Sequence, residues 1–254
     1  MYEKDMILAG NILLNSYGFD WEEFCGQFHD DWNMEIEGTY DEFTCQFAIG
    51  EVNVACMYAP APKAGAVEAA ANNTIWTNAK EMTATHVAHV EVGIMDCPDP
   101  LRRHVLYTMV ASSMLKQENT IGLFRYPTVH EKHDFIAGAE TLKQDEFPVS
   151  LWVYVGYYKN ANGLWSSYTY GMEDFGRAEM EILNTDKTAY EMFLFMAQLV
   201  KFLITEGQDL EGSSAISDEK GNSYAITMSE AVAYIPPAPK ETQYSKSLRI
   251  SYNL

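Results

Sequence analysis

Residues 42–58 read EFTCQFAIGEVNVACMY, and this stretch decides the fold of the N-terminal part of the chain. From Phe43 to Ile49 every second residue is apolar, which is the pattern of a strand that buries one face. The Gly50-Glu51 pair then gives a tight reversal into a second run of strand-forming residues. The stretch therefore predicts a β-hairpin.

The segments around the hairpin extend this pattern. In chain order we expect a strand at 5–14, a helix from Asp20 to about residue 32, a turn at Gly38, the hairpin, an Ala-rich helix at 63–79 and a strand at 84–95. Asp20 can cap its helix, and two glutamates follow it at the positive end of the helix dipole. The resulting order, β-α-β-β-α-β, predicts a ferredoxin-like α+β unit over residues 1–96.

Residues 97–254 predict a degenerate second α/β half with mixed or antiparallel sheets, packed with the first into one compact unit. We expect helices at 99–116, 131–142 and 187–205, and strands at 120–125, 149–158, 164–170, 178–184 and 248–252. The polar or proline-rich segments 207–223 and 235–247 predict surface loops.

The chain is strongly acidic. It contains 17 Lys and Arg residues and 36 Asp and Glu residues, which gives a formal charge of −19 over 254 residues. A field of this sign repels phosphate backbones and anionic membranes, so nucleic acid and membrane are not expected partners. It suits a protein partner with a basic surface, because complementary charge speeds encounter.

Location and redox state follow from what the sequence lacks. We find neither a cleavable apolar leader nor an apolar run of the roughly 20 residues that a membrane span needs, so we expect a cytoplasmic protein. The cysteines, Cys25, Cys45, Cys56 and Cys97, form no C-x-x-C pair and predict free thiols. The chain also has no G-x-S-x-G elbow, phosphate-binding loop or dinucleotide fingerprint, and we expect no cofactor.

Three stretches resemble a bacterial family known as domain of unknown function 4261. They are SYTYGMEDFGRAEMEI at 167–182, HVAHV at 86–90 and FPVSLWV at 147–153. The first has a Thr-x-Gly turn, a Phe-Gly pair and a following Glu, and the resemblance spans most of residues 40–205. It implies a cytoplasmic bacterial α+β protein and supplies no substrate, cofactor or catalytic residue.

The histidines offer two candidate sites. His86 and His89 lie on opposite faces if 84–95 is a strand, and His89 is the better functional candidate because Glu91 could orient its imidazole. His130, His133 and Asp134 could converge at a helix start as metal ligands, with a further ligand such as Asp96 or Asp99. The structural alternative is a core histidine in the first case and a solvated charged string in the second.

Carboxylates and aromatic residues offer a third site. Glu173 and Glu179 could perform general acid/base chemistry. Strand alternation would place Trp152 with Tyr154, and Tyr168 with Tyr170, at the rim of an aromatic cleft that binds a ligand or partner. The alternatives are a glycine-permitted turn for the carboxylates and cross-strand stacking for the aromatics.

These observations favour a non-catalytic binding or interaction module, of immunity or regulatory type, for a basic protein partner. The alternative is a hydrolase or lyase that uses a His/Glu pair in the aromatic cleft. An architectural subunit that pairs through its edge strands, and a homo-oligomer, also stay open.

Overall fold

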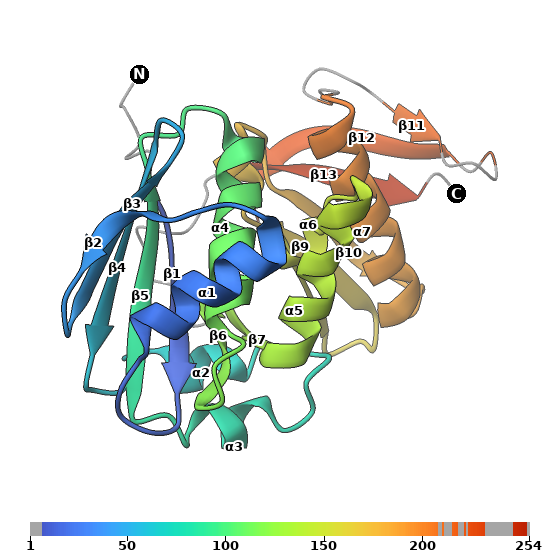
Figure 1. Ribbon diagram of the computed structural model, residues 1–254. Coiled ribbons are helices and arrows are strands. Elements are labelled where there is room, and N and C mark those ends of the chain that lie inside the picture. Colours follow the sequence, from blue (N-terminus) through green and yellow to red (C-terminus); the bar gives the residue numbers. More distant parts are fainter. Residues whose placement is uncertain are drawn as a thin grey trace. The chain divides into compact units, whose positions relative to one another are not determined.

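The computed structural model describes residues 7–207, 210, 215–217, 221, 223–231 and 246–252. The chain divides into two compact units, Met1–Pro148 and Val149–Leu254. Each unit has its own sheet (Figure 1).

The first unit is built on a seven-stranded sheet in which all neighbouring strands are antiparallel. Its order is β2 (Glu37–Tyr40), β3 (Thr44–Ile49), β4 (Val52–Ala59), β5 (Ala88–Met95), β1 (Leu8–Leu14), β6 (Thr120–Arg125) and β7 (Thr128–Glu131). The expected hairpin is confirmed as β3 and β4, which turn between the paired residues Ile49 and Val52.

One face of this sheet carries the longer helices, α1 (Trp21–Trp32), α4 (Pro100–Met114) and α5 (Lys132–Glu140), the last followed by the 3₁₀ turn η1 (Thr141–Gln144). Helix α1 begins where expected, because the Asp20 carboxylate accepts the Glu23 N–H at 2.9 Å. Its Phe24 and Phe28 rings lie 6.0 and 6.4 Å from Phe47 of β3 and bury the helix against the sheet.

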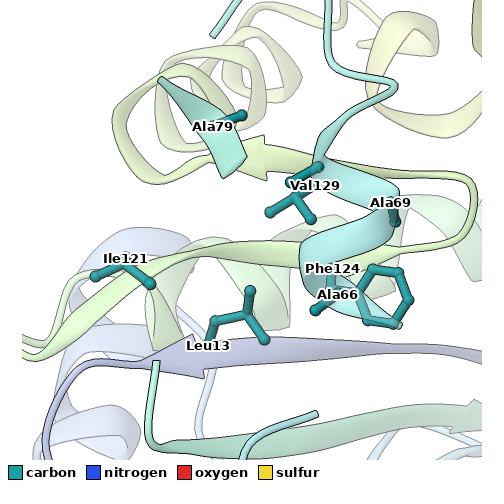
Figure 2. Packing of buried hydrophobic residues seen from close by; sticks show 8 residues of the cluster. Leu13, Ala66, Ala69, Ala79, Ile121, Phe124 and Val129 are labelled. Carbon is teal, nitrogen blue, oxygen red and sulfur yellow. The ribbon is translucent and has the colours of Figure 1, made fainter. Parts of the chain in front are cut away.

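The other face carries two short helices, α2 (Ala66–Ala70) and α3 (Ala79–Thr83), in place of the single helix expected at 63–79. The Asn73 side chain explains the break, since its carbonyl oxygen accepts the N–H groups of Ile75 and Trp76 and so replaces helical bonds. Figure 2 shows the cluster that these helices cover, with Leu13, Ile121, Phe124 and Val129 under the alanines. Strand alternation puts Leu13 on this face and Ile12 on the other.

The α+β class is confirmed, but the ferredoxin-like strand order is not found. In a split βαβ unit, one strand lies between the two parallel strands that the first helix joins. Here α1 leads into β2, a strand that was not predicted from the sequence. Three strands, β3, β4 and β5, lie between β2 and β1 in the sheet. Gly38 lies inside β2, paired with Phe47 of β3, rather than in a turn. The position requires glycine because an added Cβ would meet the Gln46 carbonyl oxygen of β3 at 2.1 Å.

The boundary between the units also differs from the expected one near residue 96. Strand β6 pairs with β1, so the segment after α4 returns to the first sheet and completes it. Division after Pro148 therefore keeps that sheet in one unit.

The second unit contains a six-stranded sheet in the order β11 (Ala215–Ser217), β12 (Ser223–Glu230), β13 (Lys246–Tyr252), β10 (Met180–Thr185), β9 (Trp165–Tyr170) and β8 (Tyr154–Lys159). Strands β10 and β13 are parallel, and the other pairs are antiparallel. Helix α7 (Ala189–Thr205) contacts β8 and β9, and its start is fixed by a capping box between Thr188 and Glu191.

Two segments of this unit depart from expectation. The run 149–158 is not one strand, because it opens as the helical turn α6 (Val149–Trp152), in which the Val153 N–H donates to the Val149 carbonyl at 2.9 Å. The segment 207–223 contains β11, and 235–247 lies outside the described residues up to Lys246, where β13 begins. Within the described part of the chain, no helix is both long and apolar enough to cross a membrane.

Candidate functional site

Glu179 is a buried carboxylate that holds the turn after β9. Its side chain accepts hydrogen bonds from the Thr169 hydroxyl at 2.7 Å, the Gly171 N–H at 2.7 Å and the Met172 N–H at 2.9 Å. Only 2% of the residue is exposed. Both carboxylate oxygens are therefore engaged with the turn, in an arrangement that we call the Glu179 clamp.

Burial sets the protonation behaviour of this clamp. It raises the pKa of Glu179 to about 7, against the opposing effect of hydrogen bonds from the Thr169 side chain and from the backbone of Gly171 and Glu173. Glu173 adds a smaller upward effect and is itself exposed, on the 3₁₀ turn η2 (Met172–Phe175). The two expected acid/base candidates thus differ in environment: Glu173 is exposed, whereas Glu179 is buried and accepts hydrogen bonds from backbone N–H groups.

The Thr-x-Gly…Phe-Gly…Glu motif is explained by this geometry. Thr169 and Gly171 supply donors to Glu179, and Gly171 has a φ of 114° that disfavours any side chain. Gly176 ends η2 with a φ of 69°. The motif encodes a turn, as the structural alternative predicted.

Two of the four aromatic candidates, Tyr154 and Tyr168, pack against each other. The Tyr154 and Tyr158 rings lie 6.1 and 6.5 Å from Tyr168, which is only 6% exposed. Trp152 is in α6 rather than on the strand with Tyr154, and its ring stacks on Phe175 at 6.1 Å.

Tyr170 pairs with Tyr154 across β8 and β9. Each strand contributes one tyrosine to this pair, as expected if the aromatic residues stabilise the sheet by cross-strand stacking. Tyr154, Tyr158 and Tyr168 thus form a packed cluster across the two strands, and Tyr154 and Tyr170 are half-buried.

Gly156 makes the cluster possible. A Cβ there would meet the Tyr168 ring at 2.4 Å, so Gly156→Ala is expected to lower the free energy of unfolding by about 2 kcal/mol. Denaturant titration checks this. Gly26→Ala is the matched control, because its Cβ would meet nothing within 4 Å and alanine favours a helix. Equal effects of the two substitutions would contradict the packing.

His89 and His86 hold the loop that leaves β4. The His89 Nδ1 atom bonds the Ala61 carbonyl at 2.7 Å, and the His86 Nε2 atom accepts the Lys63 N–H at 2.8 Å. Burial lowers the pKa of His89. Glu91, expected to orient His89, lies 3.6 Å from the Lys63 ammonium instead.

The expected metal ligands do not converge. His133 is exposed and bonds Glu131 at 2.9 Å, whereas burial lowers the pKa of His130, which lies edge-on to Phe135, to about 4. Asp99 caps α4. Among the described residues, no group of three or more His, Cys, Asp and Glu side chains is placed to hold a metal ion.

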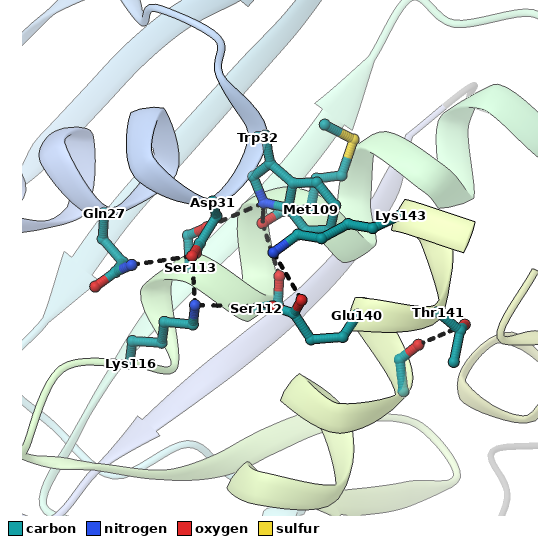
Figure 3. Close-up of polar contacts among 11 residues, drawn as sticks. Gln27, Asp31, Trp32, Met109, Ser112, Ser113, Lys116, Glu140, Thr141 and Lys143 are labelled. Atoms are coloured by element: carbon teal, nitrogen blue, oxygen red, sulfur yellow. Dashed lines mark hydrogen bonds and ion pairs between the residues drawn. The ribbon is translucent and has the colours of Figure 1, made fainter. Parts of the chain in front are cut away.

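Another polar cluster joins helices of the first unit (Figure 3). Asp31 of α1 accepts the Ser113 hydroxyl at 2.7 Å and pairs with the Lys116 ammonium. The Trp32 indole N–H donates to the Met109 carbonyl at 3.2 Å, and the Lys143 ammonium lies 5.1 Å from the Trp32 ring. The cluster ties α1 to α4 and η1.

A groove of about 700 Å³ in the first unit was not predicted from the sequence. It is lined by residues 17–23, by Tyr40 at the end of β2 and Asp41 after it, and by residues 117–119 after α4. We call it the acidic groove, because five lining residues are carboxylates and none is Lys or Arg: Asp20, Glu22, Glu23, Asp41 and Glu118.

The frame of the acidic groove is fixed by hydrogen bonds. The Gly18 N–H donates to the Tyr58 hydroxyl at 2.8 Å, and the Asn119 amide donates to the Gly18 carbonyl at 2.8 Å. The Gln117 side chain bonds both the N–H and the carbonyl of Asp20, at 3.1 and 2.6 Å. The loop before α1 is thus held from two sides.

Exposed aromatic side chains surround this frame. Tyr17 is 69% exposed and Tyr40 52%, while Phe43, at 45%, stacks on Tyr58 at 6.4 Å. Asp41 accepts the Phe43 and Thr44 N–H groups, which lowers the pKa of Asp41 and keeps it ionised. The groove therefore combines fixed negative charge with apolar contact area.

One cation lies near the rim. The Lys132 ammonium donates to the Gln117 carbonyl at 2.6 Å. Desolvation lowers the pKa of Lys132, although Glu118 and Glu23 oppose that effect. This lysine offsets part of the charge of two of the five carboxylates.

A comparison with family models matches residues 168–240 to the family described as Domain of unknown function (DUF4261). The match contains the Glu179 clamp and extends past residue 205, where we expected the resemblance to fade. It begins well after residue 40, where we expected the resemblance to start. Neither a curated protein nor a solved structure matches the chain. The family that the sequence resembles is thereby confirmed for residues 168–240, the segment that matches the model described as Domain of unknown function (DUF4261).

Proposed function

We propose that this is a non-catalytic interaction module of the bacterial cytoplasm, and that its acidic groove binds a basic segment of a partner protein. The observation that supports this proposal most strongly is the set of five carboxylates around one groove, with no Lys or Arg in its lining. A regulatory or immunity-type role, in which binding neutralises the partner, fits such a surface.

The physical contributions to binding are separable. Clustered negative charge raises the rate of encounter with a basic surface and makes it sensitive to salt. Exposed tyrosines such as Tyr17 and Tyr40 supply large contact areas with few rotatable bonds. The hydrogen-bonded frame reduces the ordering cost of binding.

The test uses two variants with equal charge. The groove variant carries Glu22→Gln, Glu23→Gln and Glu118→Gln, and leaves Asp20 and Asp41 in place because both cap backbone N–H groups. The control variant neutralises three exposed glutamates that do not line the groove: Glu51→Gln, Glu81→Gln and Glu146→Gln. Each full-length chain captures proteins from lysate of its own host, and the partner is then purified for titration.

We expect the wild type and the control variant to bind the same basic protein. The groove variant should raise its dissociation constant by about tenfold, since three rim charges contribute roughly 0.5 kcal/mol each. Equal binding by all three chains would overturn the proposal. A bound metal or a small-molecule substrate in native mass spectrometry would instead favour the hydrolase or lyase alternative.

A further inference from the structure

Three of the four cysteines lie on neighbouring elements of the first unit. Cys25 is on α1, Cys45 on β3 and Cys56 on β4. Cys45 and Cys56 are directly paired in the β3–β4 register. Segments distant in sequence thus bring three thiols to one place in the fold.

Packing holds α1 over Cys45. Phe24, beside Cys25, and Phe28 both contact Phe47, two residues along β3 from Cys45 and on the same face. The mutual effect of the two thiols on their pKa values agrees with this proximity, because Cys45 is the largest influence on the pKa of Cys25 and Cys25 the largest on that of Cys45.

The two thiols differ in access and in acidity. Cys25 is partly exposed, whereas Cys45 and Cys56 are buried. The hydrogen bond from Cys45 lowers the pKa of Cys25, although burial and Glu22 oppose it. The same hydrogen bond and burial raise the pKa of Cys45, and burial raises that of Cys56. Cys25 is the accessible nucleophile of the cluster.

We propose that Cys25 and Cys45 form a reversible disulfide when the protein meets hydrogen peroxide. This modification site is independent of the acidic groove and of the function proposed for it. The evidence for it is the packing of α1 on β3, which places a partly exposed thiol and a buried thiol on two adjacent elements.

The chemistry has two steps. The Cys25 thiolate attacks one peroxide oxygen, the O–O bond breaks, and a sulfenic acid and hydroxide form; the hydroxide takes up a proton to give water. The Cys45 sulfur then attacks the Cys25 sulfur, the S–S bond forms and the S–O bond breaks. The Cys45 proton leaves with the released oxygen as a second water. Two thiols are oxidised, one peroxide is reduced, and a thiol reductant reverses the change.

The sequence allows the linkage to be mapped. No Lys or Arg lies between Cys25 and Cys56, so trypsin leaves the three cysteines on one peptide. Glu35, Glu42 and Glu51 separate them, and cleavage after glutamate resolves each pairing. The full chain is treated with peroxide at neutral pH, quenched by alkylation, digested and analysed by mass spectrometry.

The expected product has lost two hydrogen masses and two of its four alkylatable thiols. The Cys25 and Cys45 peptides should be joined, and dithiothreitol should restore all four thiols. Cys56→Ser is expected to keep the linkage. Cys45→Ser should stop at a Cys25 sulfenic acid that dimedone traps.

Two results would overturn the proposal. One is a wild-type chain that keeps four thiols under peroxide concentrations that oxidise a free cysteine. The other is a linkage of Cys45 to Cys56, or of either to Cys97, in place of Cys25. Both results are read from the wild-type chain, so the proposal can be tested even if a cysteine variant fails to fold.

Discussion

Glu179→Ala is expected to lower the free energy of unfolding by about 4 kcal/mol, because it leaves the Gly171 and Met172 N–H groups and the Thr169 hydroxyl without their acceptor. A single buried N–H that loses its partner costs roughly 1–3 kcal/mol. Denaturant titration of the full chain measures the change.

Glu179→Gln gives the same account a second test through pH. The folded pKa of about 7 lies above the ordinary value of 4.5, so the folded state binds the proton more tightly. The carboxyl therefore stabilises the fold fully below pH 4.5, and this contribution of about 3 kcal/mol is lost as pH rises through 7. Wild type should lose stability relative to Glu179→Gln between these pH values.

The difference between the two chains isolates this group, because other titrating residues contribute equally to both. Glu173→Ala on the same turn is the control, and its exposed side chain should change the free energy of unfolding by about 0.5 kcal/mol. A Glu179→Ala variant as stable as Glu173→Ala would show that the Glu179 clamp does not hold the turn.

Asp31→Ala is expected to cost about 3 kcal/mol of stability in the first unit. The Asp31 side chain is 7% exposed, and its removal leaves Lys116 with only the longer contact to Glu140, at 3.9 Å, and the Ser113 hydroxyl without its acceptor. Lys116 is 26% exposed and regains some hydration, which keeps the cost at the lower end of the range for buried pairs. Chemical denaturation followed by the fluorescence of the chain's five tryptophans, which include Trp32, measures the change.

The adjacent Asp30 provides the control for this substitution. Its side chain is 78% exposed, so Asp30→Ala should change stability by about 0.5 kcal/mol or less. Adding Lys116→Met to Asp31→Ala should recover part of the loss, because the uncompensated charge is then removed. Additive effects of the two substitutions would contradict the coupling.

Elements with strong local signals could be predicted from the sequence. The hairpin of β3 and β4 has period-two alternation around Gly50, and α1 and α4 begin at the caps Asp20 and Asp99. These signals act within a few residues, so the sequence alone specifies them.

Elements that depend on tertiary contacts could not be predicted. Strand β2 has four exposed residues and no alternation, and it exists through its pairing with β3. Because β2 carries no local signal, the sequence predicts a ferredoxin-like strand order that the first sheet does not have. The break between α2 and α3 depends in part on Asn73, whose amide also reaches the Val129 carbonyl of β7.

The candidate site shows the same limit. Glu179 was identified from the sequence, but its three donors and its burial depend on how the turn closes. The acidic groove is assembled from three segments that are far apart in the chain, so no local motif marks it. Its one local signal is the run SYGFDW at 16–21, where turn-forming and aromatic residues fall between a strand and a helix.

Hydrogen exchange of the full chain, with and without the purified partner, tests whether the acidic groove is the binding site. We expect slower exchange on binding in the segments that line the acidic groove, 17–23, 40–41 and 117–119, with loss of this protection in the groove variant. Protection confined to other segments, or unchanged exchange in these three at saturating partner, would contradict it.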